Sequence, residues 1–443
     1  MNRRQALQSL SLVSLGTALA GCRSSSDAGP GPSSKTAAPS GDSSATVTPG
    51  AGGVLAVRAA RMTPGPTARA GADLTSFGVK VLLKDAQIGA TANGSISPYS
   101  IYTALAMTDA GAIGKTQSQL AAILGGDQQR QAGNITAVDA AVAKAVAASK
   151  ESSTPAVVRA ANSLWPDKQL PVRHDYLQQL ASGYGAQMHV VDFRGDPSGA
   201  MAQINKWVSE RTHDLIPQLL APGSVTPQTR LELVNALYLK ASWAKDFSAP
   251  GDPAAFTTAS GQQVTVRYMD VESRMTTAKG SDWQSVTIPY DGDGLAMTIV
   301  LPAKGRFAAV RASLASVLLR ATRGSGSGTV SLSMPPFSID TRSKLAPALK
   351  ALGVTQLFSP ACDLSGIAGH SGDIKVGSVT HQSVVKVDQH GTEAAAATAI
   401  GVQAGAVPQQ MPQQIRVNRA FFFVIHDTTT GAPLFLGQIA DPS

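Results

Sequence analysis

Apolar residues along this chain follow two different periods. Spacings of three and four residues predict amphipathic helices around Leu74, Phe77 and Val81 and again over 200–215. A nearly continuous apolar run over 231–239 predicts a strand that is buried on both faces. Helical and strand patterns do not alternate as in βαβ units, so the chain is predicted to have an α+β fold.

Turn signals divide the remaining pattern. Asp291-Gly-Asp-Gly separates two apolar runs and predicts a hairpin. Pro335-Pro336 interrupts another run, which indicates a break or a sheet edge there. The other expected elements are helices over 101–109, 116–124 and 343–352, and strands over 157–165, 383–387 and 421–425.

The last two of these strands are joined by an unusually long segment, from Asp388 to Ala420. Ordinary connections have about 4–6 residues, and a much longer one is usually functional or disordered. Its first part consists of small residues and one acid, and it could lie in solvent or enter a sheet without clashes. Because strand side chains alternate, one face would carry Thr392, Ala394, Ala396 and Thr398, and the other would carry Glu393.

The first residues resemble a targeting segment. Arg3 and Arg4 precede a short apolar stretch that ends in Leu19-Ala20-Gly21-Cys22, the pattern of a bacterial lipoprotein signal. We therefore expect a signal peptide over 1–21 and a lipid on Cys22 that anchors the protein to the outer face of a membrane. Residues 22–70 are rich in Ser, Gly, Pro, Ala and Thr and are predicted to be a flexible tether. One domain is expected over 71–443.

Composition excludes several classes of protein. The 443 residues are 43% hydrophobic, enough for one large core. Without Arg3 and Arg4, 35 basic and 29 acidic residues leave a net charge of +6, and the basic residues are scattered. This distribution argues against a nucleic-acid partner. The only cysteine besides Cys22 is Cys362, so a lipidated chain has no intramolecular disulfide.

The sequence contains no motif for catalysis or for a resident metal. There is no Gly-x-Ser-x-Gly, Gly369-His-Ser-Gly being only a near miss, and no His-Glu-x-x-His. The seven histidines do not fall at metal-ligand spacings. We therefore expect no enzyme activity, no metal and no cofactor.

Four segments, in one order along the chain, resemble motifs of a known family. They are Asn93-Gly-Ser-Ile-Ser-Pro-Tyr-Ser-Ile, Leu233-Val-Asn-Ala-Leu-Tyr-Leu-Lys-Ala-Ser-Trp, Asp388-Gln-His-Gly-Thr-Glu-Ala-Ala-Ala-Ala-Thr and Phe421-Phe-Phe-Val-Ile-His-Asp. The family is the serpins, and the resemblance extends from about Ala72 to the end. It implies a serpin fold, with a large mixed β-sheet, helices and an exposed reactive-centre loop. It also implies a monomer that inhibits serine proteases.

The resemblance assigns roles to particular residues. The proximal hinge of the loop would be Gly391, Thr392, Glu393, Ala394, Ala395, Ala396, Ala397 and Thr398. Trp243 matches the breach position at the top of the main sheet, and the shutter under the sheet would consist of Ser97, Ser100, Asn235 and His381. A protease would cleave the loop and form an acyl-enzyme, and the hinge would then insert as a new strand before deacylation. A charge or proline on the buried face of the hinge would slow insertion.

The scissile bond has two candidate positions. Counting from Gly391 places it at Gly405–Ala406, whereas counting back from Phe421 places it near Gln409–Gln410. Other residues that could occupy the primary specificity position are Ala404, Val407 and Met411. No Lys or Arg occurs between Lys386 and Arg416, which favours an elastase-like or subtilisin-like target over a trypsin-like one.

Two further functions stay open at this point. A serpin-fold lipoprotein could act as a binding protein without inhibition, in which case loop cleavage would not raise thermal stability. An extracytoplasmic hydrolase would require Ser, His and Asp to be brought together by the fold.

Overall fold

The computed structural model describes residues 49–50, 53–149, 155–374, 376–393 and 411–443. Contacts divide the chain into Met1–Asp42 and Ser43–Ser443, and all described residues belong to the second unit. None of its described helices is long and apolar enough to cross a membrane. The calls on Cys22 and on the 1–21 signal lie outside the described residues.

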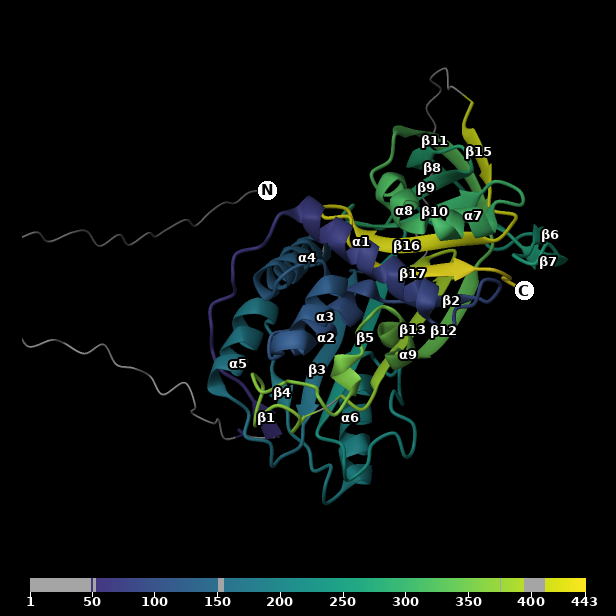
Figure 1. Ribbon diagram of the computed structural model, residues 1–443. Helices are drawn as coiled ribbons and strands as arrows, with labels where there is room; N and C mark the ends of the chain where they lie inside the picture. The colour runs from purple at the N-terminus through teal and green to yellow at the C-terminus, as the bar shows by residue number, and fades with distance from the viewer. Residues whose placement is uncertain (1–48, 51–52, 150–154, 375, 394–410) are drawn as a thin grey trace, which may run out of the picture. The chain divides into compact units, whose positions relative to one another are not determined.

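A seven-stranded mixed sheet forms one layer of this unit (Figure 1). Its strands, in spatial order, are β1 (Val54–Leu55), β4 (Met188–His189), β3 (Val157–Pro166), β5 (Leu231–Ser242), β14 (Gly391–Thr392), β13 (Val379–Asp388) and β12 (Phe337–Lys344). The pairs β3–β5 and β12–β13 are antiparallel, whereas β5 and β13 are parallel.

A second sheet has eight strands. In spatial order they are β15 (Gln413–Arg416), β11 (Gly326–Met334), β8 (Met269–Lys279), β9 (Trp283–Pro289), β10 (Leu295–Pro302), β16 (Phe421–Asp427), β17 (Pro433–Ile439) and β2 (Gly94–Ile96). A separate hairpin consists of β6 (Pro253–Thr257) and β7 (Gln263–Arg267). Pro335-Pro336 lies between β11 and β12, which belong to different sheets, so the predicted break marks the passage of the chain from one sheet to the other.

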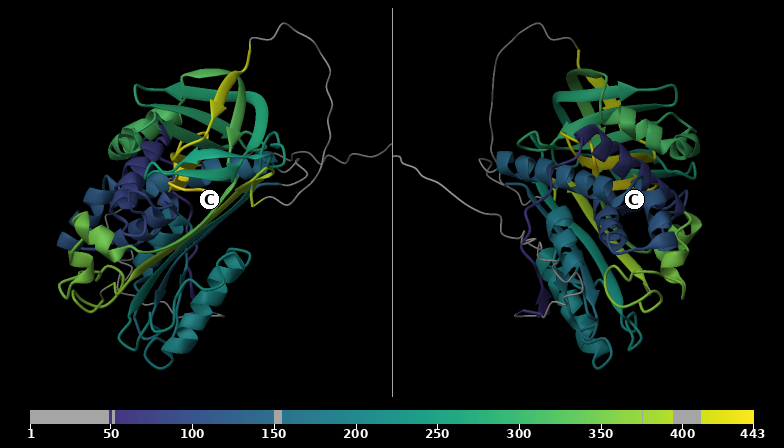
Figure 2. Two further views of the ribbon diagram at one scale, coloured as in Figure 1. Left: turned by 90° about the vertical axis from the view of Figure 1, so that its right-hand side faces the viewer. Right: turned by 60° about the vertical axis from the view of Figure 1, so that its left-hand side comes forward.

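Helices pack on both sheets: most cover the two faces of the seven-stranded sheet, whereas the helix Leu314–Ala321 contacts β8, β9 and β10 of the eight-stranded sheet. The helices are α1 (Thr67–Lys84), α2 (Pro98–Asp109), α3 (Gly114–Leu124), α4 (Gln128–Ala148), α5 (His174–Gln179), η3 (Leu180–Tyr184), α6 (Pro197–Arg211), α7 (Phe307–Ala312), α8 (Leu314–Ala321), α9 (Ala346–Ala351) and η4 (Gln356–Phe358). The left view of Figure 2 shows α6 alone on one face and α1 to α4 beyond the other. The predicted helix over 343–352 was wrong at its start, because Ser343 and Lys344 still pair in β12.

Local sequence explains why these elements begin and end where they do. The Ser97 side chain accepts a hydrogen bond from Ser100 N at the start of α2, and Pro98 occupies the first turn. Asp196 caps α6 in the same way, through Gly199 N. Gly125 ends α3 with φ 84°, a left-handed conformation that glycine adopts most readily.

Two apolar clusters pack against the seven-stranded sheet. Most buried side chains form one large cluster between the sheets and helices, and a smaller one lies between the sheet and α6. Strand β5 contributes to both, because its side chains alternate: Leu233 and Leu237 face the large cluster, and Val234 and Ala236 face α6. A strand buried on both faces was predicted here from the continuous apolar run.

Part of the segment predicted to be a tether contacts the domain. Val54 and Leu55 pair with β4 at the edge of the sheet. Arg61 forms an ion pair with Asp139 at 2.7 Å, and Met62 N donates a hydrogen bond to Ser182 O. Specific contacts therefore begin near residue 53, while the domain boundary at residue 71 stays a prediction.

Candidate functional site: an incompletely paired sheet and its hinge

The centre of the seven-stranded sheet is incompletely paired. Strands β5 and β13 pair directly only between Leu233–Ala236 and Val379–Gln382. Above these four pairs, residues 237–240 and 383–386 do not pair with each other. At the top, β14 lies between the two strands and is antiparallel to both. The sheet therefore has a partly filled position between β5 and β13.

The first two residues of the predicted hinge fill the top of this position. Gly391 pairs with Ser242, and Thr392 pairs with Ala241 on one side and Val387 on the other. Gly391 has φ 151°, and a Cβ there would overlap the carbonyl oxygen of Ala241. This close approach requires glycine.

Thr392 is buried, whereas the next residue leaves the strand. The Thr392 hydroxyl hydrogen-bonds to the Tyr290 hydroxyl at 2.6 Å, and burial raises the pKa of Tyr290. Glu393 N donates to Lys386 O at 3.1 Å, but Glu393 has φ 52°, a left-handed conformation. Its half-buried carboxyl has a raised pKa because desolvation outweighs the opposing effect of Lys386.

Trp243 connects the end of β5 to the turn before the hinge. Its Nε1 donates to Asp388 O at 2.9 Å, and its backbone N donates to His390 O. Its ring stacks on Tyr290 with centroids 4.5 Å apart and an interplanar angle of 8°. Because Tyr290 also holds Thr392, one aromatic pair supports both sides of the hinge entry.

The Asp388–Gly391 turn is held by further hydrogen bonds. His390 Nδ1 lies 3.0 Å from Asp246 Oδ2, and the Asp388 carboxylate accepts hydrogen bonds from the backbone N of His390 and Gly391. The turn is therefore fixed both through the His390 side chain and through its backbone N–H groups.

The four residues predicted to form the shutter lie together under the lower, paired part of the sheet; we call them the polar cluster. Ser97 N donates to His381 Nε2 at 3.0 Å, and His381 Nδ1 donates to Asn235 Oδ1 at 2.6 Å. Asn235 Nδ2 reaches Thr380 O at 3.4 Å. Complete burial lowers the pKa of His381 to about 3, so the ring is neutral, and this pair of contacts requires the proton on Nδ1.

Other polar residues, which the sequence analysis missed, lie beside the polar cluster. Ser100 Oγ donates to Asn162 Oδ1 at 2.6 Å, and Asn162 is paired with Asn235 across β3 and β5. The Ser95 hydroxyl contacts the Ser383 hydroxyl at 2.8 Å. A polar residue at an inward position of an apolar strand was the available signal for Asn162 and Ser383.

The remaining predicted site residues lie outside the described part of the chain. These are hinge residues Ala394, Ala395, Ala396, Ala397 and Thr398, and the scissile-bond candidates Ala404, Gly405, Ala406, Val407, Gln409 and Gln410. Met411, the last candidate, is described and 95% exposed. Only Pro412 separates it from β15.

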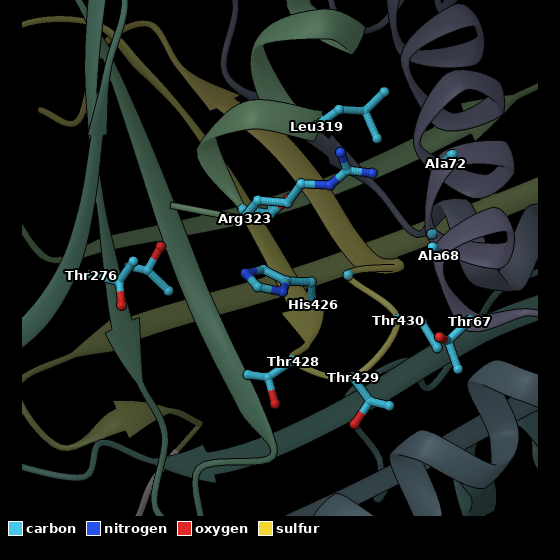
Figure 3. A pocket seen from close by; sticks show the side chains of 14 residues that line it. Thr67, Ala68, Ala72, Thr276, Leu319, Arg323, His426, Thr428, Thr429 and Thr430 are labelled. Carbon is cyan, nitrogen blue, oxygen red and sulfur yellow. The ribbon is translucent and has the colours of Figure 1, made fainter. Parts of the chain in front are cut away.

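The described residues contain no group of three or more His, Cys, Asp or Glu side chains that could hold a metal ion. A cavity of about 350 Å³ lies between α1, α8 and the 428–431 turn, with His426 at its base (Figure 3). His426 Nε2 is 2.9 Å from the Thr298 hydroxyl, and burial lowers the pKa of His426. None of the hinge or polar-cluster residues lines this cavity.

Comparisons with known proteins agree over most of the chain. Residues 72–442 match the family model described as Serpin (serine protease inhibitor). A serine protease inhibitor of Cyanea capillata is 32% identical over 363 residues, covering 80% of this chain and 94% of the relative. The leukocyte elastase inhibitor of Bos taurus is 32% identical over 380 residues, covering 83% and 98%. The crystal structure of a highly specific serpin from the insect Tenebrio molitor superposes with a TM-score of 0.70 at 27% identity, covering 85% and 98%.

Proposed function

Because this chain belongs to the serpin family, we propose that it inhibits serine proteases by trapping them as acyl-enzymes on its cleaved loop. The observation that carries the proposal is the position of β14. Two hinge residues already lie between β5 and β13, and the space below them is unpaired. A strand that continues from Thr392 could therefore pair with both β5 and β13.

The register of β14 defines which residues would pair during insertion. Continuing the observed register places Ala394 between Leu239 and Val385, and Ala396 between Leu237 and Ser383. These positions share the buried face of Thr392, where small uncharged side chains fit best. Residues 393–396 would thus fill the unpaired interval without breaking a pair of the sheet.

Further insertion would have to open the sheet. The same register places Ala397 and Thr398 where Gln382 now pairs with Ala236 and His381 with Asn235. The His381–Asn235 hydrogen bond closes this part of the sheet from below. The polar cluster therefore lies where insertion would begin to separate the paired parts of β5 and β13.

The chemistry would be supplied by the protease. Its serine attacks the scissile carbonyl, the peptide bond breaks, and the new amino terminus leaves with the C-terminal fragment. Insertion then carries the ester-linked protease away from the loop position before water can cleave the ester. The serpin contributes stored free energy and a strand, and none of its side chains takes part in the bond changes.

The target class follows from the loop sequence. Between Lys386 and Arg416 there is no Lys or Arg, and small and aliphatic residues predominate around Gly405. The similarity to a leukocyte elastase inhibitor supports the same class. We propose elastase-like or subtilisin-like proteases with shallow apolar pockets as targets.

The place of action is a separate proposal. The Leu19-Ala20-Gly21-Cys22 pattern supports lipidation of Cys22 and attachment to the outer face of a bacterial membrane. Labelling of cells with a fatty-acid analogue would give a labelled protein for the wild type and none for Cys22→Ser.

The test of inhibition mixes the chain from Arg23 onward with pancreatic elastase or subtilisin and analyses the products on denaturing gels. A denaturant-resistant complex is expected, and the first residue of the released peptide identifies the scissile bond. Cleavage that yields no complex with either protease and leaves the melting temperature unchanged would refute trapping and favour a binding protein.

A further inference from the structure

A polar cavity lies at the edge of the seven-stranded sheet, apart from the hinge. Strand β4 pairs with β3 through a single pair, Leu164 with Met188, so the two strands diverge on one side of it. A pocket of about 300 Å³ opens there between β3, α2, the 184–189 segment and α6. Its volume is at the lower limit of the range in which proteins bind small ligands.

Aromatic rings form one wall of this pocket. The rings of His189 and Trp207 lie 5.3 Å apart, and His189 stacks on Trp165 with centroids 4.8 Å apart and an angle of 24°. Trp165 and Trp207 meet edge to face at 5.6 Å. Of these rings, His189 and Trp207 line the pocket and Trp165 supports His189 by stacking, so a planar ligand could contact the two lining rings.

The charge of the pocket is positive. The Arg211 guanidinium lies 5.3 Å from the centroid of the Trp207 ring, and no carboxylate is among the described residues that line the pocket. Burial, and to a lesser degree Arg211, lowers the pKa of His189, so this ring is neutral at pH 7. Arg211 is then the source of charge.

A buried donor in the pocket lacks a partner. Asn162 lines the pocket, and its Oδ1 accepts a hydrogen bond from Ser100 Oγ, but Nδ2 has no hydrogen-bond partner among the described residues. A buried donor without an acceptor is unfavourable, so an acceptor atom that reaches it would be favoured. The Asn162 amide and the Arg211 guanidinium are both hydrogen-bond donors, so they favour a ligand with electron-rich acceptor atoms.

We propose that this pocket binds a small planar aromatic anion, such as an aryl carboxylate, whose ring lies against Trp207 and His189 and whose charge pairs with Arg211. Neither a protease nor cleavage of the loop is needed for this binding. Because Asn162 accepts a hydrogen bond from Ser100 of the polar cluster, an occupant that contacts Asn162 would be linked to that cluster through one hydrogen bond.

The test is titration calorimetry of the full chain, carrying Cys22→Ser, with 2-naphthoate and with the uncharged 2-naphthamide. One saturable site is expected, with the carboxylate bound at least fivefold more tightly than the amide. Arg211→Gln should remove this preference, weakening 2-naphthoate at least fivefold and leaving 2-naphthamide unchanged. The matched control is Lys206→Gln on the same helix, because Lys206 is highly exposed and does not line the pocket.

Three results would overturn the proposal. They are the absence of saturable binding at millimolar ligand, equal affinity for the carboxylate and the amide, and equal effects of Arg211→Gln and Lys206→Gln. Trp207→Leu provides a second variant, which should weaken both ligands because it removes the ring surface and not the charge. A fourth result that would overturn the proposal is equal binding to Trp207→Leu and the wild type, because the ligand would then lie elsewhere.

Discussion

Replacement of Thr392 by arginine tests the insertion mechanism most directly. Thr392 is 2% exposed, lies between β5 and β13, and hydrogen-bonds to Tyr290 at 2.6 Å. An arginine there would have to bury an unpaired charge or keep the hinge out of the sheet. An uncompensated buried charge costs about 3–5 kcal/mol.

That cost acts on the competition between insertion and deacylation. Because residue 392 already lies between β5 and β13 before cleavage, we expect the arginine to move the hinge out of the sheet. Returning it to the sheet would then add about 4 kcal/mol to the barrier to insertion and slow insertion roughly 1,000-fold, because each 1.4 kcal/mol is a factor of ten. Deacylation would then win, and Thr392→Arg should be cleaved by elastase or subtilisin at the normal site without forming a complex. The assay is the stoichiometry of inhibition from titration of active protease, with gels to follow the cleaved chain.

Thr392→Val is the matched control. It keeps the shape and burial of the side chain and removes only the hydroxyl partner of Tyr290, which contributes about 0.5–1.5 kcal/mol. This variant should still trap the protease. If Thr392→Arg traps at the wild-type stoichiometry, insertion of this hinge between β5 and β13 is not the inhibitory step.

Three other substitutions test buried side chains in, or directly after, strands of the seven-stranded sheet. His381→Leu removes both hydrogen bonds of a buried ring and leaves its partners unsatisfied, so the uncleaved chain should lose about 2–5 kcal/mol of stability, measured by denaturant unfolding; an unchanged midpoint would contradict the role of the ring. Trp243→Phe keeps most of the ring but loses the bond to Asp388, and should lower stability by about 1 kcal/mol, with no loss expected if that bond is unimportant. Glu232 is buried and its pKa is raised to about 8 from an ordinary 4.5, chiefly by desolvation. The native state then binds more protons than the unfolded state between these values, so stability should fall as pH rises from about 4.5 through 8, and Glu232→Gln should flatten this slope in melting curves.

The sequence predicted those parts of the fold that depend on local pattern. The apolar run of β5, the hairpin at Asp291 and the break at Pro335 all correspond to elements of the structure. The start of the helix after β12 was misplaced, because pairing with β13 extends the strand through Lys344. Tertiary pairing of this kind leaves no signal in the propensities of the strand's own residues.

The candidate site, like the fold, has residues that the sequence predicted and residues that it did not. The family resemblance pointed to Ser97, Asn235 and His381, but their hydrogen bonds depend on three segments that the fold brings together. Asn162 and Tyr290 belong to no motif and were missed, although one bonds to Ser100 and the other to Thr392. Such residues matter because of their neighbours on adjacent strands. Spacing along the sequence does not reveal which residues become neighbours in this way.

The position of β14 also implies that insertion has two stages, which differ in whether pairs of the sheet must break. The costly first pair of a new strand already exists at Gly391 and Thr392, so cleavage would start insertion from a formed nucleus. The next four residues gain backbone hydrogen bonds on both sides and break none of the sheet's pairs, since β5 and β13 are unpaired there. Only from Ala397 onward must parallel pairs and the His381–Asn235 bond be given up, and parallel pairs are slightly weaker than the antiparallel pairs that replace them. On this account the free energy of trapping comes mainly from the upper half of the gap, and the polar cluster determines how readily the lower half opens.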